Sequence, residues 1–399
     1  MMILSTDNDI RISLRLPQLR VLEQRQRDGL IEVEVMYRRP FATCPACSYH
    51  TRNVHDCRRQ KKLDIPVHGQ TLILVLHRRR FRCPECHKVF TEPDEICGWR
   101  RRTTERLRKQ LYEEARHQTV KQVARVYGVG QRFVRECFAN HSARQIERSG
   151  VTKDTPEILG MDEFSVRKGR RYQTLFCDLR LRRRLEVVDG RNKDSAKSYL
   201  DKLAEPEKVK VVVMDMHGPY RAAVEECLPK AEIVADKMHV VGLVNRALDK
   251  VRRRVQGRGK KEKPEVYEGR YVLLCDPADL NEKEKRQLDK LLRDYPELRR
   301  AWKLKEDFRR WFREADLRGA RLELNAWERE VEAGGPAEYR ELSRTLARWR
   351  EQILNYFRYR VTNGYLEGNN NRTKAIQRQA YGYRNTGNLR LRILLPKAA

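Results

Sequence analysis

The stretch VKVVVMD, residues 209–215, decides the fold of this chain. Its apolar run leads without interruption to Asp215, which is typical of a central strand buried on both faces. Three strand-like stretches precede it, ILGMDEFSV (158–166), YQTLFCDL (172–179) and LEVVDG (185–190), and AEIVAD (231–236) follows it. The sequence therefore predicts five strands in this region.

The helices between these strands favour a mixed topology. We expect them to begin near Asp194, Pro219 and His239, after the third, fourth and fifth strands. Three consecutive strands predict an antiparallel meander, whereas strands that alternate with helices predict parallel crossover connections. The predicted fold class is α/β, with a mixed five-stranded sheet.

Further domains are expected around this sheet, because 399 residues exceed the usual size of one hydrophobic core. The expected order is a strand-containing region at 1–99, a helical region at 100–150, the sheet at 151–250, a helical insertion at 251–357, and a last part of the α/β domain at 358–399. Aromatic residues of the insertion are available to form a separate apolar seam: Trp302, Phe308, Trp311, Phe312, Trp327 and Trp349.

The charge balance favours a polyanionic partner. The chain has 86 Lys and Arg against 56 Asp and Glu, a net charge of +30, which would repel itself unless a polyanion neutralised part of it. Nucleic acid is the leading partner, and a basic membrane-surface or ribosome-associated protein is the alternative from charge alone. No apolar run approaches the length of a membrane span and the N-terminus has no signal layout, so we expect a cytoplasmic protein.

Two cysteine pairs predict a structural zinc site. Cys44-Pro45-Ala46-Cys47 and Cys83-Pro84-Glu85-Cys86 have two-residue spacing, and each pair follows a strand-like stretch, at 31–37 and 71–81. Such spacing puts both thiolates on one tight turn, about 2.3 Å from a shared tetrahedral zinc. Four thiolates leave no open position for a substrate, so the zinc is expected to hold a small domain together; buried free thiols are the alternative.

A helix-turn-helix unit is predicted between residues 119 and 138. The stretch TVKQVARVYGVGQRFVRECF contains a short helix, a turn around Gly128 and Gly130, and a second helix. The second helix of such a unit can enter the DNA major groove, where Gln131, Arg132 and Arg135 would contact bases and phosphates. Similar hairpins also occur in proteins that do not bind DNA, so the neighbouring cysteine pairs and the net charge support this interpretation.

Two acids of the α/β region differ from the others. Asp162 lies inside an apolar strand and Asp215 closes the central one, whereas acids at other strand ends, such as Asp178 and Asp189, have an ordinary solvated role. Carboxylates on adjacent buried strands repel each other unless cations lie between them. Oxygen ligands suit Mg²⁺ or Mn²⁺, and two such ions can support an in-line displacement at a phosphodiester.

Glu367 is the best candidate for a third acid. Its surroundings, TNGYLEGNNNRTKAIQRQAYGYR (362–384), are rich in phosphate-binding side chains. If this stretch is helical, Glu367, Asn371, Lys374 and Arg378 share one face because they are spaced by four, three and four residues. One helix would then offer both metal and DNA contacts.

Three acidic blocks resemble those of the ISL-three family of bacterial insertion-sequence transposases: GMDEFSVRKGRRYQTLFCDL, VVVMDMHGPYRAAVEECLPKAEIVADKMHVV and NGYLEGNNNRTKAIQRQAYGYRN. The resemblance spans nearly the whole chain. It implies a zinc ribbon, a helix-turn-helix and a ribonuclease-H-like DDE domain with a helical insertion, and it places the catalytic acids at Asp162, Asp215 and Glu367. The family motif at 236–239 makes Asp236 and His239 expected active-site neighbours; a helix cap and a packed residue are the alternatives.

The function that follows from this resemblance is DNA transposition. It implies binding of terminal inverted repeats, metal-dependent hydrolysis at the element ends, and strand transfer into target DNA by a dimer or larger assembly, associated with the nucleoid when bound to DNA. The acids and the charge alone support only metal-dependent phosphodiester chemistry. The alternatives are a DNA-binding regulator without enzymatic activity and a ribonuclease-H-like nuclease without strand transfer.

Overall fold

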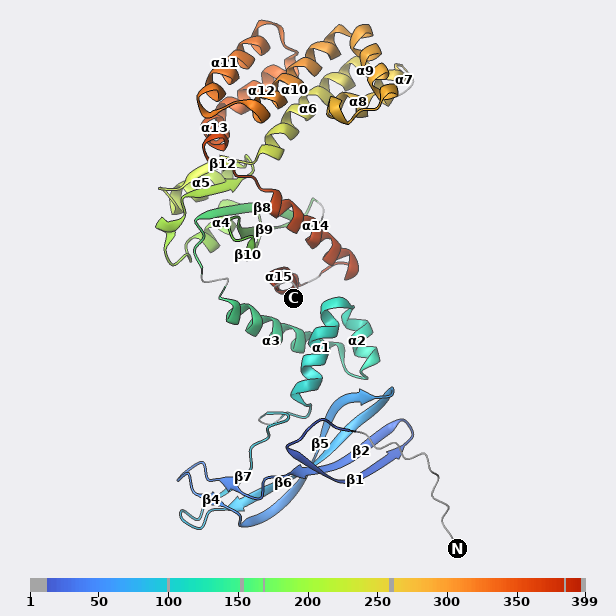
Figure 1. The fold of residues 1–399 in the computed structure, drawn as a ribbon, viewed down its shortest axis with the longest axis vertical. Helices are drawn as coiled ribbons and strands as arrows, with labels where there is room; N and C mark the ends of the chain where they lie inside the picture. Colours follow the sequence, from blue (N-terminus) through green and yellow to red (C-terminus); the bar gives the residue numbers. More distant parts are fainter. Residues whose placement is uncertain are drawn as a thin grey trace. The chain divides into compact units, whose positions relative to one another are not determined.

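The structure, a computed structural model, describes residues 13–98, 101–150, 154–167, 169–257, 262–383 and 385–395 (Figure 1). The chain divides into two units, Met1–Arg144 and Gln145–Ala399, each with its own hydrophobic clusters. The two units are described separately.

A five-stranded sheet forms most of the first unit. Strands β1 (Leu19–Arg27), β2 (Leu30–Tyr37), β6 (Gln70–Arg82) and β5 (Val54–Val67) lie in this order, and β7 (Val89–Thr91) pairs with β6. Side chains of β2 alternate between buried and partly exposed, which is the period of a half-buried strand. The strands expected at 31–37 and 71–81 are confirmed, whereas β1 and β5 were not predicted because their charged, exposed residues obscure the apolar pattern.

The helical part of this unit contains the expected hairpin. Helix α1 (Glu105–His117) is capped by Thr104, α2 (Val120–Val126) is capped by Thr119, and α3 (Gln131–Ser149) follows a short turn. Val123 and Ala124 of α2 and Val134 of α3 are buried. The short helix, the turn and the second helix predicted from the spacing are therefore present.

The second unit is built on the predicted mixed sheet, in the order β10-β9-β8-β11-β12. Its strands are β8 (Ile158–Arg167), β9 (Arg171–Asp178), β10 (Arg183–Asp189), β11 (Val211–Met214) and β12 (Glu232–Ala235). The first three are antiparallel neighbours, and β11 runs parallel to both β8 and β12. Helices α4 (Lys193–Leu200) and α5 (Gly218–Cys227) and a 3₁₀ turn (Pro206–Lys208) connect the strands. This is the topology expected of a ribonuclease-H-like fold.

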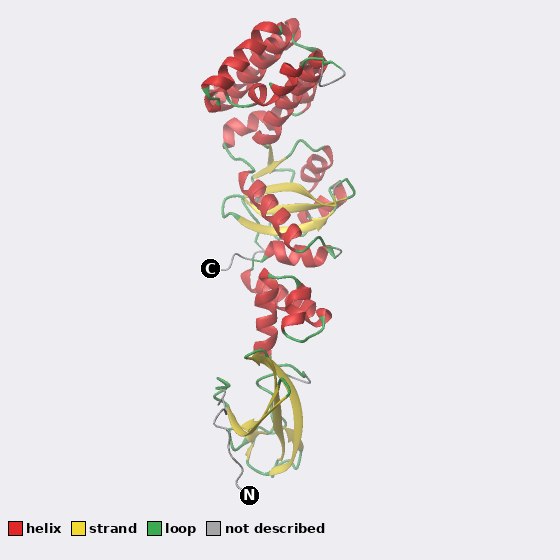
Figure 2. Ribbon diagram, turned by 90° about the vertical axis from the view of Figure 1, so that its right-hand side faces the viewer, coloured by secondary structure: helices red, strands yellow, loops and turns green. Residues whose placement is uncertain are grey.

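A bundle of helices is inserted after β12 (Figure 2). Helix α6 (Lys237–Gln256) begins beside the sheet and continues into the bundle, so the border expected at residue 250 lies inside this helix. The other members are α7 (Pro264–Glu268), α8 (Arg270–Leu274), a 3₁₀ turn (Pro277–Asp279), α9 (Glu282–Asp294), α10 (Pro296–Glu314), α11 (Leu317–Gly334), α12 (Ala337–Arg348) and α13 (Arg350–Tyr359).

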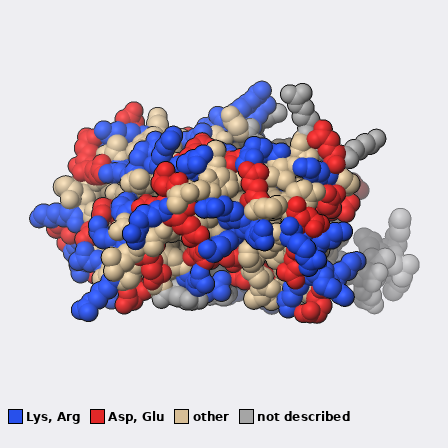
Figure 3. Space-filling view, turned by 90° about the horizontal axis from the view of Figure 1, so that it is seen from above, with Lys and Arg blue, Asp and Glu red and all other residues tan. Residues whose placement is uncertain are grey.

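The aromatic residues of the bundle do pack together, but not as a separate seam. Phe308, Trp311 and Trp327 belong to one buried cluster that also contains Val213 and Val234 of the sheet. The expectation of a separate seam was wrong because α6 connects the bundle interior to one face of the sheet. Figure 3 looks onto the bundle and shows Lys and Arg interspersed with Asp and Glu rather than one basic patch.

The chain returns to the sheet after the bundle. Helix α14 (Gly364–Gln379) contacts β8, and α15 (Thr386–Leu394) contacts β10. Leu366 and Leu389 are buried in a cluster with Leu175 of β9. Within the described part of the chain, no helix is long and apolar enough to cross a membrane.

Candidate functional site

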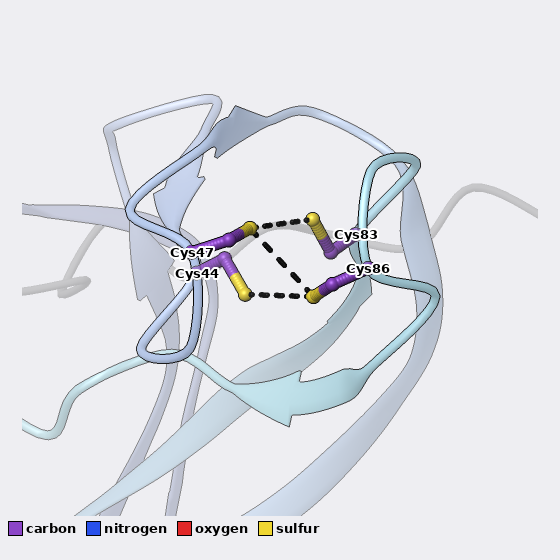
Figure 4. A group of neighbouring side chains, drawn as sticks. All are labelled: Cys44, Cys47, Cys83 and Cys86. Carbon is purple, nitrogen blue, oxygen red and sulfur yellow. Dashed lines mark hydrogen bonds between the residues drawn. The ribbon is translucent and has the colours of Figure 1, made fainter.

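The four cysteines of the two pairs converge in the first unit (Figure 4). Cys44 and Cys47 lie on the turn after β3 (Ala42–Thr43), which pairs with β4 (His50–Thr51), and Cys83 and Cys86 lie on the turn after β6. The Sγ atoms of Cys44 and Cys86 are 3.6 Å apart, and those of Cys47 and Cys83 are 3.4 Å apart. Four sulfurs at about 2.3 Å from one zinc would have nearly these separations. The donor set therefore fits a closed, structural zinc site.

The environment of Cys44 favours a thiolate. Burial opposes ionisation, but hydrogen bonds from the backbone N–H groups of Ala46 and Cys47 lower the pKa of the Cys44 thiol to about 6. Zinc binds the deprotonated form, so the same turn that spaces the two cysteines also prepares one of them for the metal.

The expected DNA-contacting residues of the hairpin lie at the exposed start of α3. Gln131, Arg132 and Arg135 are all exposed, and Arg132 forms an ion pair with Glu136 at 2.9 Å. Val134 on the same helix is buried, so the polar side chains of this first turn lie on its exposed side. Their arrangement is compatible with a helix that enters a DNA groove.

In the second unit, Asp162 and Asp215 lie side by side on neighbouring strands. The parallel register pairs Val213 of β11 with Gly160 of β8, and both acids come two residues later. Asp162 is 8% exposed, and its carboxylate accepts hydrogen bonds from the backbone N–H of Glu163 at 2.7 Å and from Asn370 Nδ2 at 2.6 Å. Burial and the nearby Asp215 carboxylate raise the pKa of Asp162 to about 7.

His239 joins this pair of acids. Its Nδ1 lies 2.7 Å from Asp215 Oδ2, and the three residues hold ligand atoms within 4.8 Å of one another. The hydrogen bond to Asp215 raises the pKa of His239 to about 9, so the imidazolium offsets part of the negative charge. The negative charge of Asp162 and Asp215 therefore stabilises the protonated form of His239.

Asp236 occupies the N-cap position of α6, but its side chain forms no capping hydrogen bond. Its side chain accepts a hydrogen bond from the backbone N–H of Asn363 at 3.2 Å instead of one from the first turn of α6. Asp236 is 3% exposed, and burial raises its pKa. It therefore links the insertion's first helix to the start of α14.

Two asparagines that were not predicted complete the surroundings of the acids. Asn363 is the N-cap residue of α14, and Asn370 lies within this helix. Asn370 donates to Asp162, while Asn363 donates its backbone N–H to Asp236 and its side chain to the Met161 carbonyl at 3.4 Å. Both are buried. The position of Asn370 about one helical turn after Glu367 was visible in the sequence. A neutral amide is equally common on exposed helix faces, however, so the residue type alone does not indicate a contact with a buried acid.

Glu367 lies on α14, as predicted, and is exposed. Among the described residues its carboxylate does not belong to the group formed by Asp162, Asp215 and His239. Asn371, Lys374 and Arg378 are also exposed on this helix, in agreement with the predicted polar face. The stretch is therefore helical, and Glu367 lies about one turn away from Asn370, which contacts Asp162.

The two acids assigned to strand ends have local structural contacts. Asp178 Oδ1 accepts a hydrogen bond from the backbone N–H of Leu181 at 2.8 Å. Asp189 accepts hydrogen bonds from Gln173 at 2.9 Å and Thr386 at 3.0 Å. Neither acid joins the cluster, but the solvated role expected of Asp178 was wrong, because its carboxylate is buried by the turn that it stabilises; Asp189 is exposed as expected.

Comparison with known proteins places this geometry in a family. The family model of the DDE transposase domain of ISL3 transposases matches residues 159–393. These residues contain the acid cluster and the helical insertion. The chain belongs to the ISL3 family of transposases. A second model, described as the zinc-finger of transposase IS204/IS1001/IS1096/IS1165, matches residues 40–86 of this ISL3 transposase.

Individual relatives agree with this assignment. The chain is 29% identical over 362 residues to the transposase for insertion sequence element IS1001 of Bordetella parapertussis, and the match covers 88% of both chains. It is 27% identical over 252 residues to the transposase for insertion sequence element IS1557 of Mycobacterium tuberculosis, with 57% of this chain and 56% of the relative covered.

Membership of the ISL3 family confirms the predicted function at the level of the whole protein. The chain is a DNA-binding enzyme that cleaves and transfers DNA, its fold is ribonuclease-H-like with an N-terminal zinc ribbon, and the family implies a divalent metal ion. The second unit offers suitable ligands. Asp215 Oδ1, Asn363 Oδ1 and Asn370 Oδ1 are buried and have no hydrogen-bond partner among the described residues, as oxygen atoms left for a cation would be.

Proposed function

We propose that this chain hydrolyses the phosphodiester at each end of an insertion sequence and transfers the exposed 3′-hydroxyls into target DNA, with Asp162, Asp215 and Glu367 as the catalytic acids. One observation carries the assignment of the first two acids. Their carboxylates lie together on adjacent parallel strands, and among the described residues the cation that joins them is His239. An acid pair with Asp162 buried and Asp215 partly buried costs stability in the absence of a cation, and such costs are typical of functional sites.

The third acid is proposed from the position of α14. Asn370 ties this helix to Asp162, and Glu367 precedes Asn370 by about one turn on the side that also bears Lys374. A small rotation or shift of the first turn of α14 when DNA binds would bring the Glu367 carboxylate toward the acid pair. Glu367 itself is exposed, but Leu366 of the same turn is buried in a cluster with Leu175, so the movement must be small enough to keep that packing.

The acids are proposed to act as ligands of two Mg²⁺ or Mn²⁺ ions. When bound, such ions activate water or a 3′-hydroxyl and stabilise the leaving oxygen in an in-line displacement. The chain's own residues position the ligands: Asn370 and the Glu163 N–H orient the Asp162 carboxylate, and His239 orients Asp215. Asp236 holds the start of α14 in place through the Asn363 N–H.

DNA binding is proposed to be divided among three parts of the chain. The zinc ribbon, held by Cys44, Cys47, Cys83 and Cys86, stabilises the first unit. The start of α3, with Gln131, Arg132 and Arg135, reads the terminal inverted repeats. The face of α14 that bears Asn371, Lys374 and Arg378 holds phosphates near the acids. Two ends must be joined, so we propose that a dimer or larger assembly forms on DNA.

The test uses the DNA that flanks the gene, in which imperfect inverted repeats are expected. A labelled end duplex is incubated with the full chain, Mg²⁺ and a target plasmid, and the products are separated on a gel. Joined product supports transposition, cutting without joining supports a nuclease, and a shifted but intact duplex supports a regulator.

Variants assign the roles of the acids in the same assay. Asp162→Asn, Asp215→Asn and Glu367→Gln remove a ligand charge with little change of shape, so each should abolish cleavage while DNA binding in Ca²⁺ persists. Asp189→Asn is the matched control and should retain cleavage. Full cleavage by the Glu367→Gln protein would place the third acid elsewhere.

A further inference from the structure

A cavity of about 710 Å³ lies in the second unit, outside the acid cluster. Its walls come from the turn between β9 and β10, from α14 and from the last residue of α3, and Figure 1 shows α14 alongside the sheet. Four arginines line it: Arg182, Arg183, Arg184 and Arg372. The volume falls within the range of binding sites for small organic groups, about 300–1,000 Å³.

Among the described residues, three of these arginines have no acidic partner. Arg183 forms an ion pair with Asp154 at 3.0 Å and lies 3.8 Å from Asp178. Within the described ranges, Arg182, Arg184 and Arg372 form no ion pair with Asp or Glu. The cavity therefore carries a net positive charge that the described residues leave uncompensated.

Arg184 is held in a fixed place at the cavity wall. It is 8% exposed, and its Nη2 donates a hydrogen bond to the Leu395 carbonyl at 2.7 Å. Burial is the main cause that lowers the pKa of Arg184, and the nearby positive charge of Arg372 lowers it further. Two neighbouring guanidinium groups that repel each other in a partly desolvated cavity are stabilised by a bound anion, just as paired carboxylates are stabilised by a cation.

The turn that presents Arg182 is itself strained. Arg182 has a φ of 51°, in the left-handed region that residues other than glycine rarely adopt. The hydrogen bond from the Leu181 N–H to Asp178 fixes this turn. Backbone strain of this kind is tolerated where it positions a functional side chain.

Helix α14 separates the cavity from the acids. Asn363 and Asn370 contact the acid cluster, whereas Tyr365, Asn369 and Arg372 line the cavity. At 3.6 residues per turn these two sets occupy different sides of the helix. Gly364 and Gly368 also line the cavity and leave room there for a ligand.

We propose that this cavity binds a backbone phosphate of DNA, in a segment distinct from the phosphodiester that is cut at Asp162 and Asp215. The proposal rests on the proposed function, because it extends the path of DNA across α14 from the acid side to the arginine side. Planar guanidinium groups bind phosphate oxygens in pairs, and a cavity with several of them around open space suits a phosphate with its attached sugar. Contacts of this type position DNA without reading its sequence.

The test is the salt dependence of DNA binding by the full chain. Binding of a labelled random-sequence duplex is measured by fluorescence anisotropy in Ca²⁺, with Asp162→Asn present in every protein so that no cutting occurs. Adding Arg372→Gln should reduce the slope of log affinity against log salt concentration by about 0.9. The loss of affinity that the substitution causes should therefore be on the order of eightfold larger at 0.1 M salt than at 1 M salt. Arg182→Gln should act in the same direction.

Arg180→Gln is the matched control. Arg180 lies in the same turn but forms an ion pair with Glu157 and does not line the cavity, so the slope should not change. Modification by phenylglyoxal, mapped by mass spectrometry, gives a second readout: duplex DNA should protect Arg182 and Arg372 and leave Arg180 unchanged.

Two outcomes would overturn the proposal. One is an Arg372→Gln protein with an unchanged slope and no protection of Arg372 by DNA. The other is a result in which inorganic phosphate raises the melting temperature of the protein with Arg372 but not that of Arg372→Gln, while the salt slope of DNA binding is the same for both. The cavity would then be a site for a small free anion. Neither outcome depends on cleavage, so failure here is distinct from failure of the proposed catalytic acids.

Discussion

Replacement of Asp162 by asparagine should stabilise the second unit while it abolishes cleavage. In the absence of divalent ions, the pKa of Asp162 in the native state is about 7, against an ordinary value of 3.8, because the carboxyl is buried beside Asp215. The native state therefore binds this proton more tightly than the unfolded state does. Stability is lost as pH rises from about 4 to about 7, since ionisation of Asp162 then favours unfolding.

The size of this effect follows from the shift. About three pKa units at about 1.4 kcal/mol each give an upper limit of about 4 kcal/mol for the stability that ionised Asp162 removes at pH 8. The introduced asparagine carries no charge, but its single side-chain oxygen can keep only one of the two hydrogen bonds from the Glu163 N–H and Asn370, which reduces the gain below this limit. The variant should exceed the parent protein in unfolding free energy by a few kcal/mol at pH 8 and by much less at pH 4.

Urea unfolding at both pH values in EDTA measures this difference. Four of the five tryptophans lie between residues 302 and 349, so intrinsic fluorescence reports mainly on the second unit. Addition of Mg²⁺ should raise the stability of the parent protein and leave the variant nearly unchanged. Asp178→Asn is the control, because Asp178 accepts the Leu181 N–H and lies near Arg183; that variant should lose stability and keep cleavage.

The reasoning is refuted if Asp162→Asn is less stable than the parent protein at pH 8, or if it still cuts a labelled end duplex in Mg²⁺. The first result would mean that the acid pair does not destabilise the metal-free fold. The second would remove Asp162 from the catalytic site.

Three further perturbations, the third with a control variant, test other parts of the molecule. Cys83→Ser should lower zinc from one ion per chain, as measured by elemental analysis, while the tryptophan-reported unfolding of the second unit stays the same; unchanged zinc would contradict the four-thiolate site. Arg135→Ala should weaken binding to end DNA more than to random duplex, and equal losses would place sequence recognition elsewhere. Gly160→Ala should cost about 1–3 kcal/mol and slow cleavage, because the new methyl group would lie 2.4 Å from Leu366 Cδ1 and push α14 from the acids. Gly368→Ala is the control: Gly368 lies on α14, and no atom of the described residues lies within 4 Å of the added carbon. This variant should change the free energy of unfolding by less than about 1 kcal/mol.

Much of the architecture could be predicted from local patterns. The apolar run before Asp215 predicted a buried central strand, and the order of strands and helices predicted the antiparallel and parallel pairings that the sheet has. The cysteine spacing predicted the thiolate cluster, since a two-residue spacing leaves little freedom in how one turn presents two thiols. In each case the decisive interactions involve residues that are close in sequence or that carry a strict periodicity.

Other features depended on contacts between distant segments. The hydrogen bond of Asn370 to Asp162 joins residues 208 positions apart, and the link from Asn363 to Asp236 spans 127. Nothing in either local sequence specifies such a partner, because an asparagine on a helix is as compatible with solvent as with a buried acid. The same holds for the contact of His239 with Asp215 and for the exposed position of Glu367 outside that group.

The arginine cavity shows the division most clearly. By itself the sequence determined that the chain carries a large positive charge and which strands bring Asp162 and Asp215 to neighbouring positions, and it predicted these acids as metal ligands. Only the tertiary structure decided which of 86 Lys and Arg are left without a carboxylate partner, because ion pairing depends on distances of a few ångströms between side chains from separate elements. Arg180 and Arg182 lie two residues apart in one turn, yet folding pairs the first with Glu157 and turns the second toward the cavity.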